Sequence, residues 1–173
     1  MITFEDILHM YEASLTDVCG SVPLDQWDTQ PTALVLTSHK TKYGMADVKG
    51  QVHINRAFIG SEAYALMEAT IRHELAHLCV GLAQGHNRHF KAVERLFQAN
   101  FRAVPTEQIK HIHDRIGHTW ELYACFVDRP KVLLKRVHRK HRKYTHYRPG
   151  LFRYLMYKGQ KISGFEYVRI TPE

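Results

Sequence analysis

Apolar residues along this chain of 173 residues recur first with the spacing of an α-helix. Thr3 and Asp6 form the pattern of a helix N-cap, and Gly20 marks a stop. Between them the apolar side chains lie on one side of a 3.6-residue repeat. The pattern predicts a scaffold helix over residues 4–18, whose inner side consists of Phe4, Ile7, Leu8, Tyr11, Leu15 and Val18.

Three short segments with the composition of strands follow, at residues 33–37, 43–48 and 51–55. Lys49-Gly50 separates the last two in the manner of a hairpin turn. We therefore expect a small three-stranded antiparallel sheet directly before the next helix. An edge strand of such a sheet either serves packing alone or pairs with an extended peptide.

A longer helical pattern covers residues 61–82, with Ser61 as its expected N-cap and neither proline nor glycine between Glu62 and Val80. Its apolar stripe faces one way, and His73 and His77 face the other way. The stripe should anchor the helix and leave both imidazoles free. Its members are Tyr64, Met67, Ile71, Leu75, Leu78 and Leu82.

Two further helices are expected, one starting near Phe90 and one over residues 106–116. From Trp120 onward the pattern changes to alternation, which predicts strands. We therefore expect an α+β fold with a first domain over residues 1–118 and a small β-rich second domain over residues 119–173. The four strands expected in the second domain cover residues 120–126, 132–137, 151–157 and 165–170.

Charge divides the chain into an acidic part and a basic part. Residues 1–128 carry 11 Lys/Arg and 15 Asp/Glu, whereas residues 129–173 carry 13 and 2. A basic tail on an acidic body favours a polyanion as partner of the tail.

Cysteine usage and hydropathy bear on the compartment. Cys19, Cys79 and Cys125 are widely spaced, which favours reduced thiols over a disulfide framework. No apolar run approaches the length of a membrane span, and acidic residues interrupt the first apolar segment. We expect a monomer in the cytoplasm, associated with the nucleoid, or in the host cytoplasm if the source is viral.

The chemistry centres on His73-Glu74-Leu75-Ala76-His77, an HExxH sequence. On a helix, two histidines four residues apart face the same zinc ion, and the glutamate after the first acts as general base. In a chain with 13 histidines this spacing also arises by coincidence, but the apolar flanks agree with a helix. The pattern predicts one Zn²⁺ bound by His73 and His77, with Glu74 as the catalytic base.

A catalytic zinc ion needs a third protein ligand and an open position for water. The metzincin spacing is excluded, because Val80 and Ala83 stand where that class has glycine and histidine. His86 is the preferred third ligand, since Gly81 and Gly85 allow the chain to turn back. Glu94 is the alternative third ligand. If His86 binds the metal instead, Glu94 is a candidate to hydrogen-bond one of the metal-binding histidines.

Several motifs together resemble the SprT family of zinc metallopeptidases, which includes the Spartan proteases. They are Gly44-Met45-Ala46, Val52-His53-Ile54-Asn55, the HExxH sequence, and Gly85-His86 ahead of Phe90. The resemblance covers roughly residues 33–101. It implies a zincin-like core, with His73, His77 and His86 as zinc ligands and Glu74 as catalytic base.

The sequence departs from that family in two places. Asn87 stands where the family usually has glycine, a change that a left-handed backbone at this position would still tolerate. The family also has a C-terminal zinc ribbon with two pairs of cysteines. Here Cys125 is kept but Val127 replaces its partner, and Tyr154-Leu155-Met156 lies near the second pair. We therefore expect no second zinc site, with aromatic packing in its place.

A basic segment lies between two of the expected C-terminal strands. Lys and Arg interleaved with Tyr and His favour contact with a phosphate backbone and stacking on unpaired bases, although a merely solvated loop is the alternative. The residues predicted to bind nucleic acid are Lys135, Arg136, Arg139, Lys140, Arg142, Lys143 and Arg148.

The predicted function joins these parts. Together, the metal site and the basic segment predict a zinc-dependent metalloendopeptidase that meets its substrate on DNA, which it binds as a single strand or without sequence specificity. The resemblance to the SprT family implies the more specific task of cleaving DNA-associated or DNA-crosslinked proteins. Two alternatives remain open at this point: a nucleic-acid-binding protein with a non-proteolytic zinc site, and a partner-specific peptidase that DNA does not activate.

Overall fold

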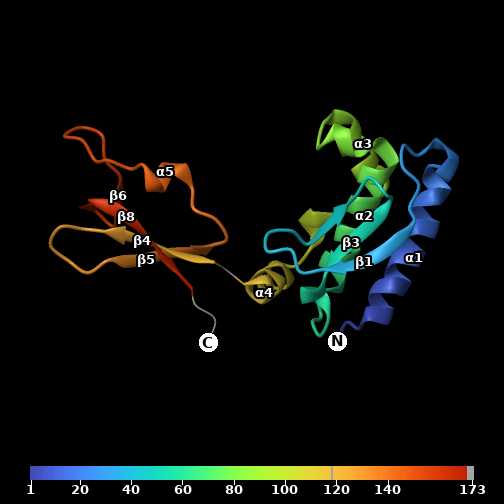
Figure 1. The fold of residues 1–173 in the computed structure, drawn as a ribbon, viewed down its shortest axis with the longest axis horizontal. Coiled ribbons are helices and arrows are strands. Elements are labelled where there is room, and N and C mark those ends of the chain that lie inside the picture. The colour runs from blue at the N-terminus through green and yellow to red at the C-terminus, as the bar shows by residue number, and fades with distance from the viewer. Residues whose placement is uncertain (118, 171–173) are drawn as a thin grey trace. The chain divides into compact units, whose positions relative to one another are not determined.

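A computed structural model describes residues 1–117 and 119–170, and the chain forms two compact units, Met1–Ile116 and Gly117–Glu173. Both helices and small sheets are present, so the fold is α+β (Figure 1). His118, the last residue of the expected first domain, lies outside the described residues. Within those residues, no helix is both long and apolar enough to cross a membrane.

Helix α1, Phe4–Ser21, opens the N-terminal unit with the expected cap. The Thr3 amide donates to the Asp6 carboxylate (2.8 Å), and the Asp6 amide donates to the Thr3 hydroxyl (3.1 Å). Ile7, Tyr11 and Val18 are buried, as the repeat predicts. Phe4 was expected on the inner side but is 44% exposed, since it lies in the first turn before the helix reaches the core.

The sheet of this unit is mixed, so the expectation of an antiparallel sheet was wrong for one of its two pairings. Strand β3, Gln51–Asn55, lies between β1, Ala33–Thr37, and β2, Gly44–Ala46. The hairpin keeps β2 antiparallel to β3, but β1 pairs with β3 in parallel. Strand β3, with Val52 and Ile54 fully buried, takes the centre, so β1 pairs with β3 and not with β2.

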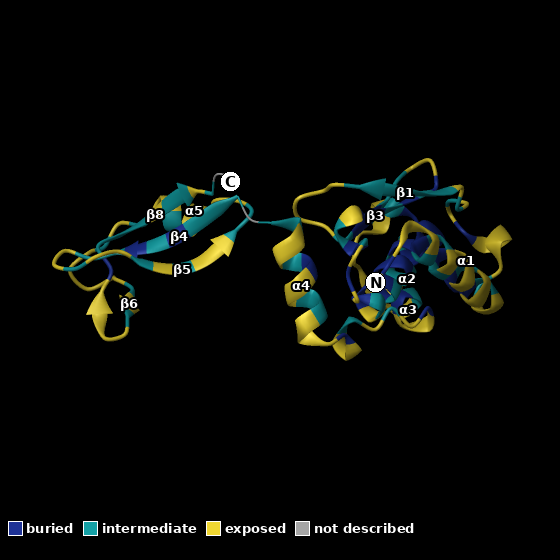
Figure 2. Cartoon of the chain, turned by 90° about the horizontal axis from the view of Figure 1, so that it is seen from below, coloured by how far each residue is buried: buried dark blue, intermediate teal, exposed yellow. Residues whose placement is uncertain are grey.

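Helix α2, Tyr64–Val80, contacts both β2 and β3 and is flanked by α1 and α3. Its apolar stripe is only part of its buried surface, because Leu66, Ala69 and Ala76 on other sides are buried as well. Figure 2 shows most of α2 in the colour of buried residues. Ser61 is not its N-cap. The Ser61 hydroxyl instead donates to the Phe58 carbonyl at 2.7 Å, and the helix begins after Ala63.

The remaining helices of this unit, α3 and α4, both contact α2. Gly81, with φ of +93°, ends α2, and its Cα approaches the Asp28 carboxylate so closely that a Cβ would lie 2.8 Å from it. Helix α3 covers Arg88–Leu96, and α4 covers Thr106–Ile116. Short 3₁₀ turns lie at Leu24–Gln26, Arg56–Phe58, Leu82–Gln84 and Phe101–Ala103.

The C-terminal unit is built on a three-stranded antiparallel sheet. Its central strand is β4, Trp120–Cys125, between β5, Val132–Val137, and β8, Gly164–Arg169. Leu122, Ala124 and Ile162 are buried and form a small core. A one-turn helix, α5, Arg142–Thr145, lies in the basic segment.

The strand expected over residues 151–157 is mostly absent. Only β6, Met156–Tyr157, is extended, and it pairs with β7, Gln160–Lys161. The Gly150 amide donates to the Arg153 carbonyl at 2.9 Å, which closes a turn within the segment. The strand predicted from alternating apolar and polar residues was therefore wrong here, because the side chains of Leu151 and Phe152 face solvent and not a core.

Candidate metal centre

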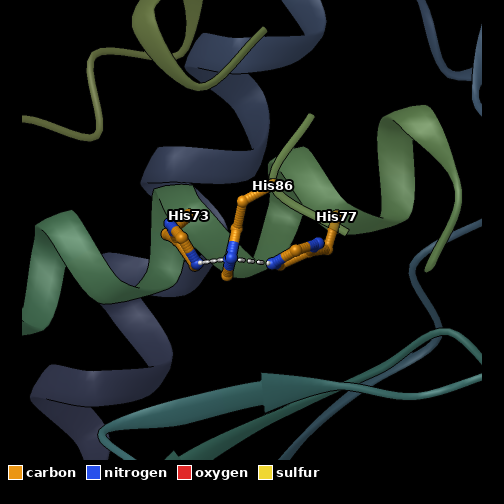
Figure 3. A group of neighbouring side chains, drawn as sticks. All are labelled: His73, His77 and His86. Atoms are coloured by element: carbon orange, nitrogen blue, oxygen red, sulfur yellow. Dashed lines mark hydrogen bonds between the residues drawn. The ribbon is translucent and has the colours of Figure 1, made fainter. Parts of the chain in front are cut away.

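Three histidines from two neighbouring segments converge on one point (Figure 3). Helix α2 presents His73 and His77 one turn apart. The chain then turns through Leu82–Gln84 and Gly85, whose φ is +54°, and brings His86 back to them. The Nε2 atom of His86 lies 3.1 Å from Nε2 of His77 and 3.2 Å from Nε2 of His73. The three side chains lie close enough to bind a metal ion.

Two of the three nitrogen pairs, at 3.1 Å and 3.2 Å, have the spacing that ligands of one metal ion have. A tetrahedral ion with metal–nitrogen bonds of about 2.0–2.1 Å holds its ligand nitrogens about 3.3 Å apart. His86 Nε2 carries at most one proton, so it can donate to only one of its two neighbours. An ion would satisfy all three lone pairs together. Imidazole ligands suit zinc, copper, iron and nickel rather than calcium or magnesium.

The electrostatic surroundings keep two of the imidazoles neutral, which is the form that binds metals. Burial lowers the pKa of His73, although its hydrogen bond to Glu94 acts in the opposite sense. Burial, together with the neighbouring His73 and His86, lowers the pKa of His77 to about 4.

Glu94, the alternative third ligand, lies behind His73 rather than in the triad. Its Oε1 atom is 2.7 Å from His73 Nδ1, and its Oε2 atom is 2.7 Å from Lys91 Nζ. Burial alone would raise the pKa of Glu94, but the hydrogen bonds from Lys91 and His73 outweigh it and lower that pKa. Glu94 stays ionised and accepts the proton of His73 Nδ1 in a hydrogen bond. This fixes the His73 tautomer in which Nε2 is unprotonated and can bind a metal ion through its lone pair.

Glu94→Gln is therefore expected to weaken the binding of a metal ion by the triad by about 10–100-fold, because a neutral amide orients and polarises His73 less. Competition with a chromophoric chelator measures this affinity. Glu12→Gln, on the exposed face of α1, is the matched control and should leave it unchanged. Equal affinities for the Glu94→Gln variant and the wild type would contradict the role assigned to Glu94.

Glu74 lies beside the triad in a cleft of ≈ 500 Å³. Its side chain is 6% exposed. Burial raises the pKa of this carboxyl to about 7, while a hydrogen bond from the Ala46 backbone amide and the charge of Lys42 act to lower it. The cleft walls come from α2, the turn that carries His86 and the segment Thr41–Ala46, with Phe101 at one side.

Strand β2 forms one wall of the cleft and has a free edge there. Its backbone bonds to β3 run through Tyr43, whose carbonyl accepts from Asn55, and Asp47, whose amide donates to Gln51. In an antiparallel pair these positions alternate, so the peptide groups of Gly44 and Ala46 point away from β3. One of them, the Ala46 amide, reaches Glu74.

Close contact between β2 and α2 explains the glycine at position 44. A Cβ there would lie 2.7 Å from Thr70 Cγ2 and 3.0 Å from Glu74 Cγ. Gly44→Ala must therefore push β2 away from the helix, and we expect it to destabilise the protein by about 1–3 kcal/mol. It should also reduce any activity that depends on Glu74.

Chemical denaturation checks the Gly44→Ala prediction. Gly20→Ala in α1 is the control, because a Cβ at that position meets nothing within 4 Å. The control should keep or raise the free energy of unfolding, since alanine favours helix more than glycine does. Similar stability of both variants would show that the β2–α2 contact is looser than described.

Several features of the site were not predicted from sequence. Asn87 has an extended backbone with φ of −70° and caps α3, where its side chain accepts from the Phe90 amide at 2.9 Å. The left-handed residue is Gly85. No motif in the sequence indicates that Lys42, Tyr43 and Phe101 line the cleft. The cap of α3 could have been found, because an Asn three residues before Phe90 is a recognisable N-cap pattern.

The residues predicted to bind nucleic acid are all exposed in the C-terminal unit. Arg136 is engaged by Glu121 at 3.0 Å. Lys140 lies 4.0 Å above the Trp120 ring, and Lys135 and Lys143 each lie 5.6 Å from the Tyr144 ring. The basic segment thus presents cations and aromatic rings together.

Comparisons with protein-family models, with curated proteins and with solved structures found no match to this chain.

Proposed function

We propose that this protein is a zinc-dependent metalloendopeptidase. The observation that carries the proposal is the combination of the triad of His73, His77 and His86 with the buried carboxyl of Glu74 in one open cleft. Three histidines leave a tetrahedral ion one position for water, as catalytic zinc sites require. A structural zinc site would instead use four protein ligands.

The residues of the cleft would have different roles in peptide hydrolysis. Zinc, when bound, would lower the pKa of its water toward neutrality and polarise the carbonyl. Glu74 would receive the proton of the attacking water on its carboxylate and then deliver it to the leaving amine. A carboxyl with a pKa near 7 is suited to both transfers at neutral pH.

The free edge of β2 is suited to hold the substrate chain. An extended peptide could pair with the outward peptide group of Gly44 and so lie along the cleft beside Glu74. Because backbone groups make such a contact, it would accept many sequences. This supports a peptidase of broad specificity acting on extended or unfolded segments.

The charge of the C-terminal unit supports nucleic acid as the second partner. The part of the chain from residue 129 carries 13 Lys/Arg against 2 Asp/Glu, and one of these acids, Glu166, is paired with Lys131 at 3.0 Å. Leu151 and Phe152 are 86% and 98% exposed next to Arg153. Exposed rings among cations suit unpaired bases. We therefore propose that the substrates are proteins bound or crosslinked to DNA.

Cleavage of a DNA-binding protein with and without single-stranded oligonucleotide tests the proposal. We expect the oligonucleotide to raise the rate about tenfold or more by bringing enzyme and substrate together, and a zinc chelator to abolish cleavage. Charge reversal of Arg139, Lys140, Arg142 and Lys143 should remove the stimulation but keep the basal rate.

The outcomes separate the competing functions. Binding of DNA without any metal-dependent cleavage would indicate a nucleic-acid-binding protein with a non-proteolytic metal site. Cleavage at a rate that DNA does not change would indicate a peptidase directed to a particular protein partner.

A further inference from the structure

A second, wider pocket of ≈ 850 Å³ lies next to the metal centre in the N-terminal unit. It is formed by the C-terminal half of α3 and the turn after it. Phe101 lines both this pocket and the cleft that contains Glu74. Glu94, which contacts His73, is also in its wall. The pocket therefore adjoins the proposed active site without including Glu74.

Positive charge dominates the wall of this pocket. Lys91, Arg95 and Arg102 line it, whereas Glu94 is its one acid and is already bonded to His73 and Lys91. Arg95 and Arg102 are exposed, and neither forms an ion pair within the described part of the chain. The Nε atom of Arg95 donates to the Lys91 carbonyl at 3.2 Å, which restrains its guanidinium.

Backbone carbonyls at the end of α3 would ordinarily repel an anion. Here they are occupied. The Glu94 carbonyl accepts from the Ala99 amide (3.0 Å), the Arg95 carbonyl from the Gln98 amide (3.1 Å), and the Phe97 carbonyl from the Arg72 guanidinium (3.0 Å). These carbonyl oxygens already accept hydrogen bonds. The side chains left to meet a ligand in the pocket are therefore mainly hydrogen-bond donors, above all Arg95 and Arg102.

We propose that the pocket binds phosphate groups of a nucleic acid strand. Guanidinium groups match phosphate oxygens in paired hydrogen bonds, and the pocket is larger than a single carboxylate requires. A strand with regularly spaced phosphates can engage Arg95 and Arg102 together. This inference rests on the proposed nucleic acid partner and adds a contact within the acidic part of the chain, close to the metal centre.

The test measures oligonucleotide affinity at several salt concentrations by fluorescence anisotropy. It uses the full chain, zinc-loaded and carrying Glu74→Gln to prevent self-cleavage. Arg95→Glu with Arg102→Glu is compared with Arg56→Glu and Lys110→Glu, two exposed cations of the same unit outside the pocket. The two double variants change net charge equally.

We expect the pocket variant to bind at least tenfold more weakly than the control, with a slope of log affinity against log salt that is shallower by about one to two. Equal affinity of the two double variants would overturn the inference and leave the C-terminal basic residues as the binding site. No oligonucleotide binding by the parent protein would instead overturn the nucleic acid part of the proposed function, and the inference with it.

Two further arms identify other ligands. If inorganic phosphate raises the melting temperature of the parent protein but not of the pocket variant, while oligonucleotide affinity is equal, the site takes a small free anion. If the pocket variant changes where an active enzyme cuts a protein substrate, with unchanged DNA affinity, the site takes an acidic segment of the substrate. Either result overturns the assignment to nucleic acid.

Discussion

Glu74→Gln is expected to slow peptide hydrolysis by about 10²–10⁴-fold while leaving metal content unchanged. Glutamine has the same shape and can still accept from the Ala46 amide, but it cannot take a proton from water. Glu74 is not within the nitrogen triad, so its loss should not release the ion. Cleavage of an unfolded protein substrate, followed by gel densitometry, measures the rate.

The control for this substitution is again Glu12→Gln, which removes a carboxylate from an exposed position of the same unit. It should leave hydrolysis unchanged. Elemental analysis of both variants verifies that each retains the metal content of the wild type. A Glu74→Gln variant that cleaves within about threefold of the wild-type rate would remove the proposed mechanism.

His86→Ala is expected to eliminate stoichiometric zinc binding. His86 is the one member of the triad on an exposed turn, and without it two helix histidines remain, which is fewer than a zinc site uses. Elemental analysis of the purified protein should give about one zinc per wild-type chain and close to none for the variant. The fold should persist, since the His86 side chain is exposed.

His89→Ala is the matched control, because His89 is exposed and only three residues away, in the first turn of α3. It should retain the full metal content. Retention of zinc by His86→Ala would show that another group completes the site, and Glu94 would then be the first to examine, since it already reaches His73.

The triad of histidines could be predicted from sequence because it depends on residues that lie close together along the chain. The spacing of His73 and His77 fixes their side-by-side position on any helix, and Gly81 and Gly85 supply the turn that returns His86. Glu94 was predicted as a partner of one of the histidines if His86 joined the site, and it does contact His73. Which histidine it contacts depends on how α3 packs against α2, which no spacing records. The same holds for the contact of Glu74 with the Ala46 amide.

The errors in the predicted fold arise where tertiary context decides. Pairing of β1 with β3 depends on which strand takes the most buried place, not on order along the chain. The segment around Leu151 and Phe152 has the alternation of a strand, but it closes a turn and leaves these apolar side chains in solvent. Alternation reports a half-buried strand only where a core exists on one side.

The three histidines of the triad differ in how they are supported by the fold. His73 and His77 belong to the helix that is packed by α1, α3 and the sheet, whereas His86 stands on a surface turn closed by two glycines. A displacement of that turn alone would open the coordination sphere. We therefore expect that a bound ion would load and leave in the native state, at rates set by local opening of the turn instead of global unfolding.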